Sequence, residues 1–151
     1  MPRLRHVVGL MVVVLLASGC DRQRATTSAY RRIVGTWRIQ TMRVDGFDYT
    51  SLLTERYNRL RLQLATDPSR FQWTSAGGLQ LAGTVLLQNT RTMVWSGGFS
   101  KPVYWRYEKT TFGVVLETAG VAAGADALTE RLAPSIGATT RSTIVLRLER
   151  P

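Results

Sequence analysis

Short segments in which apolar and polar side chains alternate recur along most of this chain, and they constrain its fold more than any other feature. The clearest of them is Arg59-Leu60-Arg61-Leu62-Gln63-Leu64, in which every second residue is leucine. Strict alternation predicts a β-strand with one buried face and one face in water. The same pattern recurs at Trp37 and Ile39, at Phe71 and Trp73, and at Ile144, Leu146 and Leu148.

Turn-forming residues separate these segments at short intervals. Pairs of this kind are Asp45-Gly46, Asp67-Pro68, Gly77-Gly78, Asn89-Thr90 and Gly97-Gly98. About eight strands joined by short turns, with no β-α-β pattern, favour consecutive antiparallel strands over a parallel sheet. The sequence therefore predicts an all-β fold, an eight-stranded up-and-down barrel that closes on itself and leaves no exposed edge. A two-sheet sandwich is the alternative.

Two segments interrupt the strand pattern. The stretch from Ser51 to Tyr57 predicts a helical turn capped by Thr50 or Ser51. The stretch from Ala119 to Thr139 is rich in alanine and glycine, and a short helix is expected around Ala127 to Leu132. This second segment is either a lid over the barrel or a disordered insertion. One or two short helices thus accompany the strands.

The N-terminus has the organisation of an export signal. Two arginines precede an unbroken apolar run from Val7 to Ala17, which is too short to span a membrane and typical of a signal peptide. Small residues follow, and then Cys20, the only cysteine. This arrangement resembles the lipobox of bacterial lipoproteins. The resemblance implies cleavage between Gly19 and Cys20 and a diacylglycerol group on the Cys20 thiol. An ordinary signal peptide with a chance cysteine is the alternative.

The lipobox divides the chain into a signal peptide (1–19), a lipidated cysteine with a polar, flexible tether (20–30) and one domain (31–151). The domain is expected on the outer side of a bacterial membrane, held there by lipid. Asp21 resembles the inner-membrane retention signal of enteric lipoproteins, but this rule varies between bacteria and leaves the choice of membrane open. The net charge of +10 favours anionic lipid headgroups over nucleic acid as a partner, because the cell envelope holds little nucleic acid.

The residues available for catalysis are few. The single histidine, His6, lies in the predicted signal peptide, and the single thiol is taken by lipid. Ser-His and Cys-His catalysis and zinc sites with histidine or cysteine ligands are therefore excluded from the mature chain. The glycine pairs indicate turns rather than a phosphate-binding loop. The acid pairs Asp45 and Asp48, and Glu108 and Glu117, are typical of scattered surface acids. We expect no catalytic residues, no metal site and no cofactor, and hence no enzyme.

The first predicted strand also carries a family motif. Gly35-Thr36-Trp37 resembles the Gly-x-Trp motif of lipocalins, and residues 33–39 are similar to the start of lipocalin-like domains in small bacterial lipoproteins. The resemblance implies a barrel with Trp37 plugging one end and an arginine from the last strand packed on it. Of Arg147 and Arg150, the parity of Arg150 favours this cation–π contact. A solvated terminal arginine is an equal alternative.

A barrel of eight strands has an interior that is either filled by side chains or able to hold one small ligand. We expect a non-enzymatic protein that binds a small apolar ligand or an envelope lipid, although a filled core is the more common use of such residues. An envelope protein that binds a protein partner through the Ala119–Thr139 segment and the basic face of Arg59 and Arg61 is the alternative. The candidate ligand-lining residues are Trp37, Ile39, Leu62, Phe71, Trp73, Met93, Trp95, Trp105, Tyr107 and Leu146.

Overall fold

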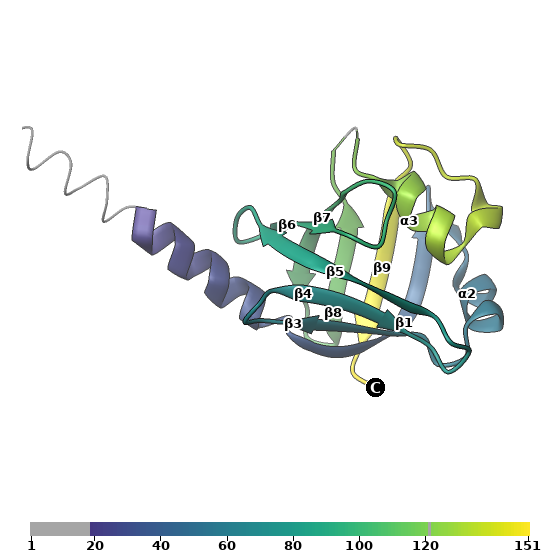
Figure 1. Cartoon of the computed structure of the whole chain (residues 1–151), viewed down its shortest axis with the longest axis horizontal. Coiled ribbons are helices and arrows are strands. Elements are labelled where there is room, and N and C mark those ends of the chain that lie inside the picture. The colour runs from purple at the N-terminus through teal and green to yellow at the C-terminus, as the bar shows by residue number, and fades with distance from the viewer. Residues whose placement is uncertain (1–18, 121) are drawn as a thin grey trace, which may run out of the picture.

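The structure is a computed structural model that describes residues 19–120 and 122–151. Eight antiparallel strands form a closed barrel, because β1 pairs with β3 on one side and with the last strand, β9, on the other. The predicted eight-stranded antiparallel barrel is confirmed, and its closure excludes the two-sheet sandwich (Figure 1). The barrel strands are β1 (Gly35–Val44), β3 (Arg61–Ala65), β4 (Arg70–Thr74), β5 (Gln80–Leu87), β6 (Thr92–Ser96), β7 (Val103–Lys109), β8 (Gly113–Thr118) and β9 (Ile144–Glu149). The two-residue strand β2 (Phe47–Asp48) extends β1 as a short hairpin.

The alternation seen in the sequence decides which side chains face inward. In β3, Leu62 and Leu64 are buried while Arg61 and Gln63 between them are exposed. Most other strands follow the same rule, because successive side chains of a strand point to opposite faces of the sheet. In β6 the outward-facing Val94 is buried as well. The inward residues of all eight barrel strands join one hydrophobic core, and the four tryptophans are fully buried in it.

One end of the barrel, here the near end, is closed by the chain that enters β1. This end also carries the turns 66–69, 88–91 and 110–112. Tyr30 and Ile33 are fully buried there, and the Tyr30 hydroxyl donates to the carbonyl oxygen of Ala65 at 3.1 Å. The indole Nε1 of Trp37 donates to the carbonyl oxygen of Ile33 at 2.8 Å. These contacts fix the start of β1 across the opening.

The opposite, far end is closed by α3 (Ala125–Leu132), which is followed by the short helix η1 (Pro134–Ile136). Leu128 and Leu132 are fully buried and belong to the barrel core. The Ala119–Thr139 segment is therefore not a disordered insertion where the structure describes it, but a cover over the barrel (Figure 1). The burial of these leucines against the barrel interior supplies the stabilisation that an alanine- and glycine-rich segment lacks on its own.

The helix α2 (Thr50–Arg56) also lies at the far end, as expected from the sequence, but its cap differs. The N-cap position is occupied by Tyr49, whose side chain makes no capping hydrogen bond. Instead the backbone N–H of Thr50 donates to Asp48 Oδ1 at 2.8 Å, and Thr50 Oγ1 accepts from the backbone N–H of Met42. The predicted capping residue thus ties α2 to β1 rather than capping the helix.

Residues 19–31 form a helix that projects from the near end (Figure 1). The polar sequence of this segment predicted a flexible tether, and its backbone is helical in the structure. At a rise of about 1.5 Å per residue, such a helix is less than half as long as an extended chain. None of the helices in the described residues is long and apolar enough to cross a membrane.

Candidate functional site

The candidate site is a groove on the outside of the barrel, at the place where β1 leaves β3. The two strands pair only from Gly35 to Arg38 of β1. Beyond that point β1 continues along β9 and meets another strand on its opposite side only at its end, where Arg43 and Val44 pair with β2. Its register with β9 shifts between Ile39 and Thr41. Such a bulge bends the strand and re-aims its side chains. The gap between the separated strands is bordered by α2.

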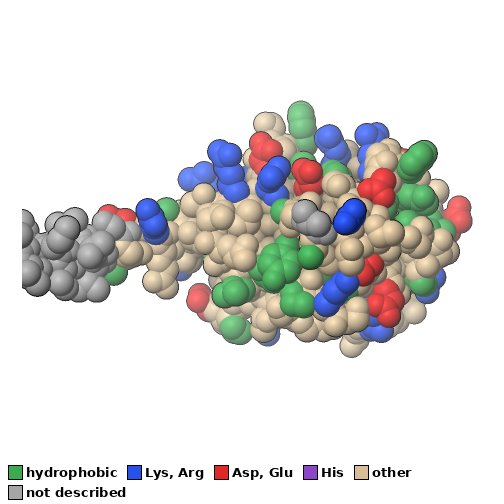
Figure 2. Space-filling model, turned by 90° about the horizontal axis from the view of Figure 1, so that it is seen from above, with side chains coloured by type: hydrophobic (Ala, Val, Ile, Leu, Met, Phe, Trp, Pro, Cys, Tyr) green, Lys and Arg blue, Asp and Glu red, His purple; other side chains and the backbone are tan. Residues whose placement is uncertain are grey.

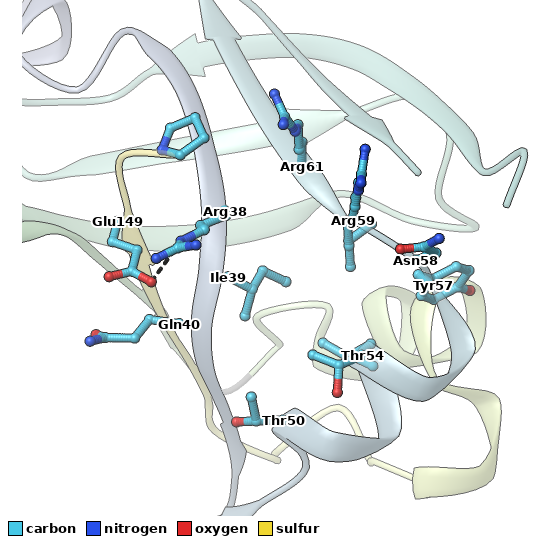
Figure 3. A pocket seen from close by; sticks show the side chains of 13 residues that line it. Arg38, Ile39, Gln40, Thr50, Thr54, Tyr57, Asn58, Arg59, Arg61 and Glu149 are labelled. Atoms are coloured by element: carbon cyan, nitrogen blue, oxygen red, sulfur yellow. Dashed lines mark hydrogen bonds and ion pairs between the residues drawn. The ribbon is translucent and has the colours of Figure 1, made fainter. Parts of the chain in front are cut away.

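This α2 groove has a volume of about 670 Å³, which is within the range of small-molecule sites. Ile39 lies at its centre between β1 and α2, and Leu53 and Leu60 contribute buried apolar surface (Figure 3). Arg59 and Arg61 extend from the β3 side, while Arg38 lies on the side of β1 and β9. The lining residues are Arg38, Ile39, Gln40, Thr50, Leu53, Thr54, Tyr57, Asn58, Arg59, Leu60, Arg61, Glu149 and Pro151.

The arginines of the groove are incompletely neutralised. Arg38 and Arg61 are opposite one another in the β1–β3 pair, an arrangement of like charges that destabilises a sheet. Glu149 pairs with Arg38, its carboxylate accepting from Arg38 Nε at 2.8 Å. Neither Arg59 nor Arg61 makes an ion pair within the described part of the chain, where the other pair joins Lys101 to Asp126. The groove therefore combines an apolar floor with two uncompensated guanidinium groups.

The backbone at Arg59 adds a second unusual feature. Its φ is +54°, in the left-handed region that non-glycine residues seldom adopt. Backbone strain of this kind often lies at binding sites, where surrounding structure holds it in place. Arg59 sits between α2 and β3, so this conformation directs the chain from the end of the helix into the strand at the edge of the groove.

The hydroxyl groups of the groove are hydrogen-bonded to the backbone of the fold. Thr54 Oγ1 donates to the carbonyl oxygen of Ser51 at 2.9 Å, and Tyr57 donates to the carbonyl oxygen of Arg131 at 3.2 Å. With Thr50 Oγ1 bound to Met42, each of these hydroxyl groups is engaged by the fold. The groove offers guanidinium donors and apolar surface, which recognise an acidic group and an apolar body.

The candidate ligand-lining residues of the barrel lie in its packed interior, with one exception. Trp95 is at the centre: its ring is 4.6 Å from the Phe71 ring, 5.0 Å from Trp105 and 6.3 Å from Trp73, between centroids. These four rings are fully buried. Trp37, Leu62, Met93, Tyr107 and Leu146 belong to the same core. Ile39 is the exception, being partly buried and part of the α2 groove.

Three polar groups of this interior have no hydrogen-bond partner among the described residues: the Nε1 atoms of Trp73 and Trp105 and the hydroxyl of Tyr107. Burial raises the pKa of Tyr107 above the ordinary value for a phenol. Burial and then the proximity of Tyr107 raise the pKa of Tyr30. The aromatic rings thus fill the interior by packing against one another, while the two indole N–H groups and the Tyr107 hydroxyl have no hydrogen-bond partner among the described residues.

The Gly-x-Trp motif lies at the near end with the arginine of the last strand. The Arg150 guanidinium carbon is 4.3 Å from the centre of the Trp37 ring, and Lys109 Nζ is 5.4 Å from it. Gly35 has φ of +140°, and a Cβ at this position would collide with the Arg150 guanidinium. Glycine is therefore needed both for the backbone and for the close approach of Arg150. Arg147 is exposed on the other face of β9.

The remaining sequence-derived residues lie apart from the groove. Gly19 and Cys20 are exposed at the start of the N-terminal helix. Within residues 19–120 and 122–151, no three or more histidine, cysteine or acidic side chains come together in a way that would hold a metal ion. Arg59 and Arg61 were singled out from the sequence as a basic face, but Arg38 was missed, because only the β1–β3 register brings it to the same site.

No protein-family model matches the chain, and neither curated proteins nor solved structures give a match.

Proposed function

We propose that this chain is a lipid-anchored, non-enzymatic protein of the bacterial cell envelope that binds a small amphiphile in the α2 groove. The ligand has an apolar part and an acidic group, as fatty acids and single-chain envelope lipids do. The observation that carries this proposal is the pair of uncompensated arginines, Arg59 and Arg61, beside the apolar floor of the groove. The proposal places the apolar ligand expected from the sequence outside the barrel rather than in its filled interior.

The combination of charges in the groove favours an anionic ligand over a neutral one. Arg38 and Arg61 face each other on the sheet, and of the two only Arg38 has a carboxylate partner among the described residues. A ligand carboxylate or phosphate supplies the missing negative charge, and guanidinium groups bind such groups with two donors at once. The partly buried side chain of Ile39, which lies beside the buried Leu53 and Leu60, provides the contact for an acyl chain.

Replacement of the two free arginines tests the binding of an anionic amphiphile. We expect palmitate to bind the protein, and Arg61→Gln to weaken its affinity about 10- to 100-fold, because hydrogen bonds to charged groups contribute about 1.5–3 kcal/mol. Arg59→Gln has an effect in the same direction. Methyl palmitate, which lacks the charge, binds the unmodified protein weakly, and titration calorimetry measures each affinity. Arg70→Gln, an exposed arginine outside the groove, is the matched control and leaves the affinity unchanged.

Three outcomes contradict this site. Equal palmitate affinity of the unmodified chain and the Arg59→Gln/Arg61→Gln double variant shows that the groove does not bind the acidic group. Quenching of tryptophan fluorescence on binding places the ligand in the barrel interior, because all four tryptophans are fully buried there. Absence of binding by any amphiphile favours the alternative, an envelope protein that works through protein contacts.

The lipid anchor is tested at Cys20. We expect Cys20→Ser to leave unprocessed precursor and to abolish incorporation of a radioactive fatty acid, since serine lacks the thiol that receives the diacylglycerol. The unmodified chain incorporates the label and migrates faster after processing. Autoradiography of the immunoprecipitated protein measures both effects. Labelling of the serine variant at the level of the unmodified chain rules out this attachment site.

A further inference from the structure

A second pocket, here the basic pocket, lies at the near end of the barrel beside the N-terminal helix. Its volume is about 320 Å³, and its four cationic side chains come from the end of the helix, the turn after β5 and the strand β7. The lining residues are Ala29, Arg32, Ile33, Thr90, Arg91, Arg106, Tyr107, Glu108 and Lys109. Glu108 is the one acid among them, so the pocket carries excess positive charge.

These cations are available for an external anion. None of Arg32, Arg91 and Arg106 makes an ion pair with another described residue, and all three are exposed. Lys109 is held at the rim, where its Nζ donates to the carbonyl oxygens of Thr110 and Gly113 at 3.1 and 3.2 Å. Basic side chains line the part of the barrel next to the helix in Figure 2. A concave surface with four cations and one acid suits a phosphate group.

An exposed aromatic side chain lies at the same end. Phe112, on the turn between β7 and β8, is 88% exposed, the largest exposed fraction among the large apolar side chains of the described residues. Lys109 lies three residues before it, at the start of the same turn. Aromatic residues are enriched at membrane–water interfaces, and basic residues beside them are attracted to anionic headgroups.

The acidic residues are placed so that the two ends of the barrel differ in charge. The turn after β1 and the helices α2 and α3 lie at the far end. These elements, with β2, carry five acids, namely Asp45, Asp48, Glu55, Asp126 and Glu130. The same elements carry two cations, Arg56 and Arg131, whereas the basic pocket has four cations and one acid. The near end is thus the more basic one, and it is the end from which the chain leads toward Cys20.

We propose that the near end of the barrel docks on an anionic membrane surface, with the basic pocket binding a lipid phosphate group and Phe112 entering the interface. The helix of residues 19–31 then lies along the bilayer. An upright helix would hold Arg31 about 17 Å from Cys20 along its axis. This distance exceeds the Debye length of about 8 Å in physiological salt, so the basic pocket would be too far from the headgroups to be attracted by them. This docking goes beyond the binding of an amphiphile in the α2 groove and does not depend on it. It does rest on the membrane location proposed above.

Tryptophan placed at each end of the barrel reports which end meets the bilayer. The full chain, purified from membranes, is reconstituted with vesicles of phosphatidylcholine alone or mixed with phosphatidylglycerol, each containing brominated lipid. We expect the fluorescence of the new tryptophan in Phe112→Trp to be quenched on the anionic vesicles. At about 1 M salt, where the Debye length falls to about 3 Å, we expect the barrel to leave the membrane surface and the quenching to be lost. Phe47→Trp is the matched control, because Phe47 is 70% exposed on the far hairpin and stays unquenched.

Two charge variants separate the effect of the basic pocket on docking from the effect of net charge. Removing three pocket arginines lowers the docking constant about 100-fold, since each basic residue near an anionic surface contributes about 1 kcal/mol. Removing three exposed arginines of the far end changes net charge equally and leaves the quenching of the Phe112→Trp variant intact. The pocket variant is R32Q/R91Q/R106Q, and the control is R43Q/R131Q/R141Q.

Co-flotation of the protein with the vesicles measures membrane attachment, and it distinguishes failure of the docking from failure of the lipid anchor. If the Phe112→Trp chain floats with both vesicle types but stays unquenched on anionic vesicles, the docking is overturned and the lipid anchor stands. If this chain floats only with anionic vesicles and is quenched there, the docking is supported and the anchor is overturned. A chain that floats with neither overturns both, and equal quenching of Phe112→Trp and Phe47→Trp overturns the assignment of the near end.

Discussion

Replacing Trp95 with alanine is expected to lower the free energy of unfolding by about 3–5 kcal/mol, the range found when large aromatic side chains are removed from protein cores. Trp95 contacts the rings of Phe71, Trp73 and Trp105, so its loss leaves a cavity that three neighbours border at once. Phe71 and Trp73 are held by β4 and Trp105 by β7, two separate strands of a closed barrel. The strands cannot move inward independently, and the cavity therefore collapses little.

Thermal unfolding followed by near-ultraviolet circular dichroism measures this effect. At about 4 °C per kcal/mol for a domain of this size, the Tm falls by about 12–20 °C. Phe112→Ala is the control, because this equally apolar ring is 88% exposed, and its removal changes stability by no more than about 0.5 kcal/mol. Equal losses for the two variants would show that the aromatic cluster is not the centre of the core.

The second large effect is expected at the seam between β8 and β9. Gly113 is buried, and a Cβ at this position would collide with the backbone carbonyl oxygen of Leu148. Gly113→Ala therefore forces the two strands apart at the position where Gly113 pairs with Glu149. We expect a loss of about 1–3 kcal/mol, the usual cost of overpacking, because backbone atoms yield less readily than a flexible side chain.

Urea unfolding of Gly113→Ala and of Gly77→Ala compares a crowded glycine with an open one. A Cβ at Gly77 would have Ser75 Oγ as its nearest neighbour, at an ordinary contact distance of 3.7 Å. The Gly77 variant is expected to be as stable as the unmodified chain or slightly more stable, because alanine restricts the unfolded state. Unchanged urea midpoints for both variants would contradict the tight β8–β9 seam.

The barrel was predictable from the sequence because its signal is local. Each strand has a period of two residues, as in Leu60, Leu62 and Leu64, and each turn is marked by residues that favour it. Every strand has one apolar face that must be buried, and no predicted helix is long enough to cover a parallel sheet. Few arrangements other than a closed barrel meet both conditions.

The groove was not predictable in the same way, because it depends on pairing between distant segments. β1 separates from β3 where its register with β9 shifts, and β1 and β9 lie about a hundred residues apart in the chain. Nothing in the sequence at Ile39 or Gln40 marks this shift. The sequence predicted a short helix within residues 119–139 but left a lid and a disordered insertion as alternatives, since burial of Leu128 and Leu132 is decided by the barrel beneath them.

The position of β1 between β3 and β9 has a consequence for the order in which the chain folds. One side of the first strand has no barrel partner until the last strand, Ile144–Glu149, is available. A chain synthesised from its N-terminus thus carries an open sheet edge until its last strand has been made. Closure of the barrel is then a late event, because it joins segments that lie about a hundred residues apart in the chain.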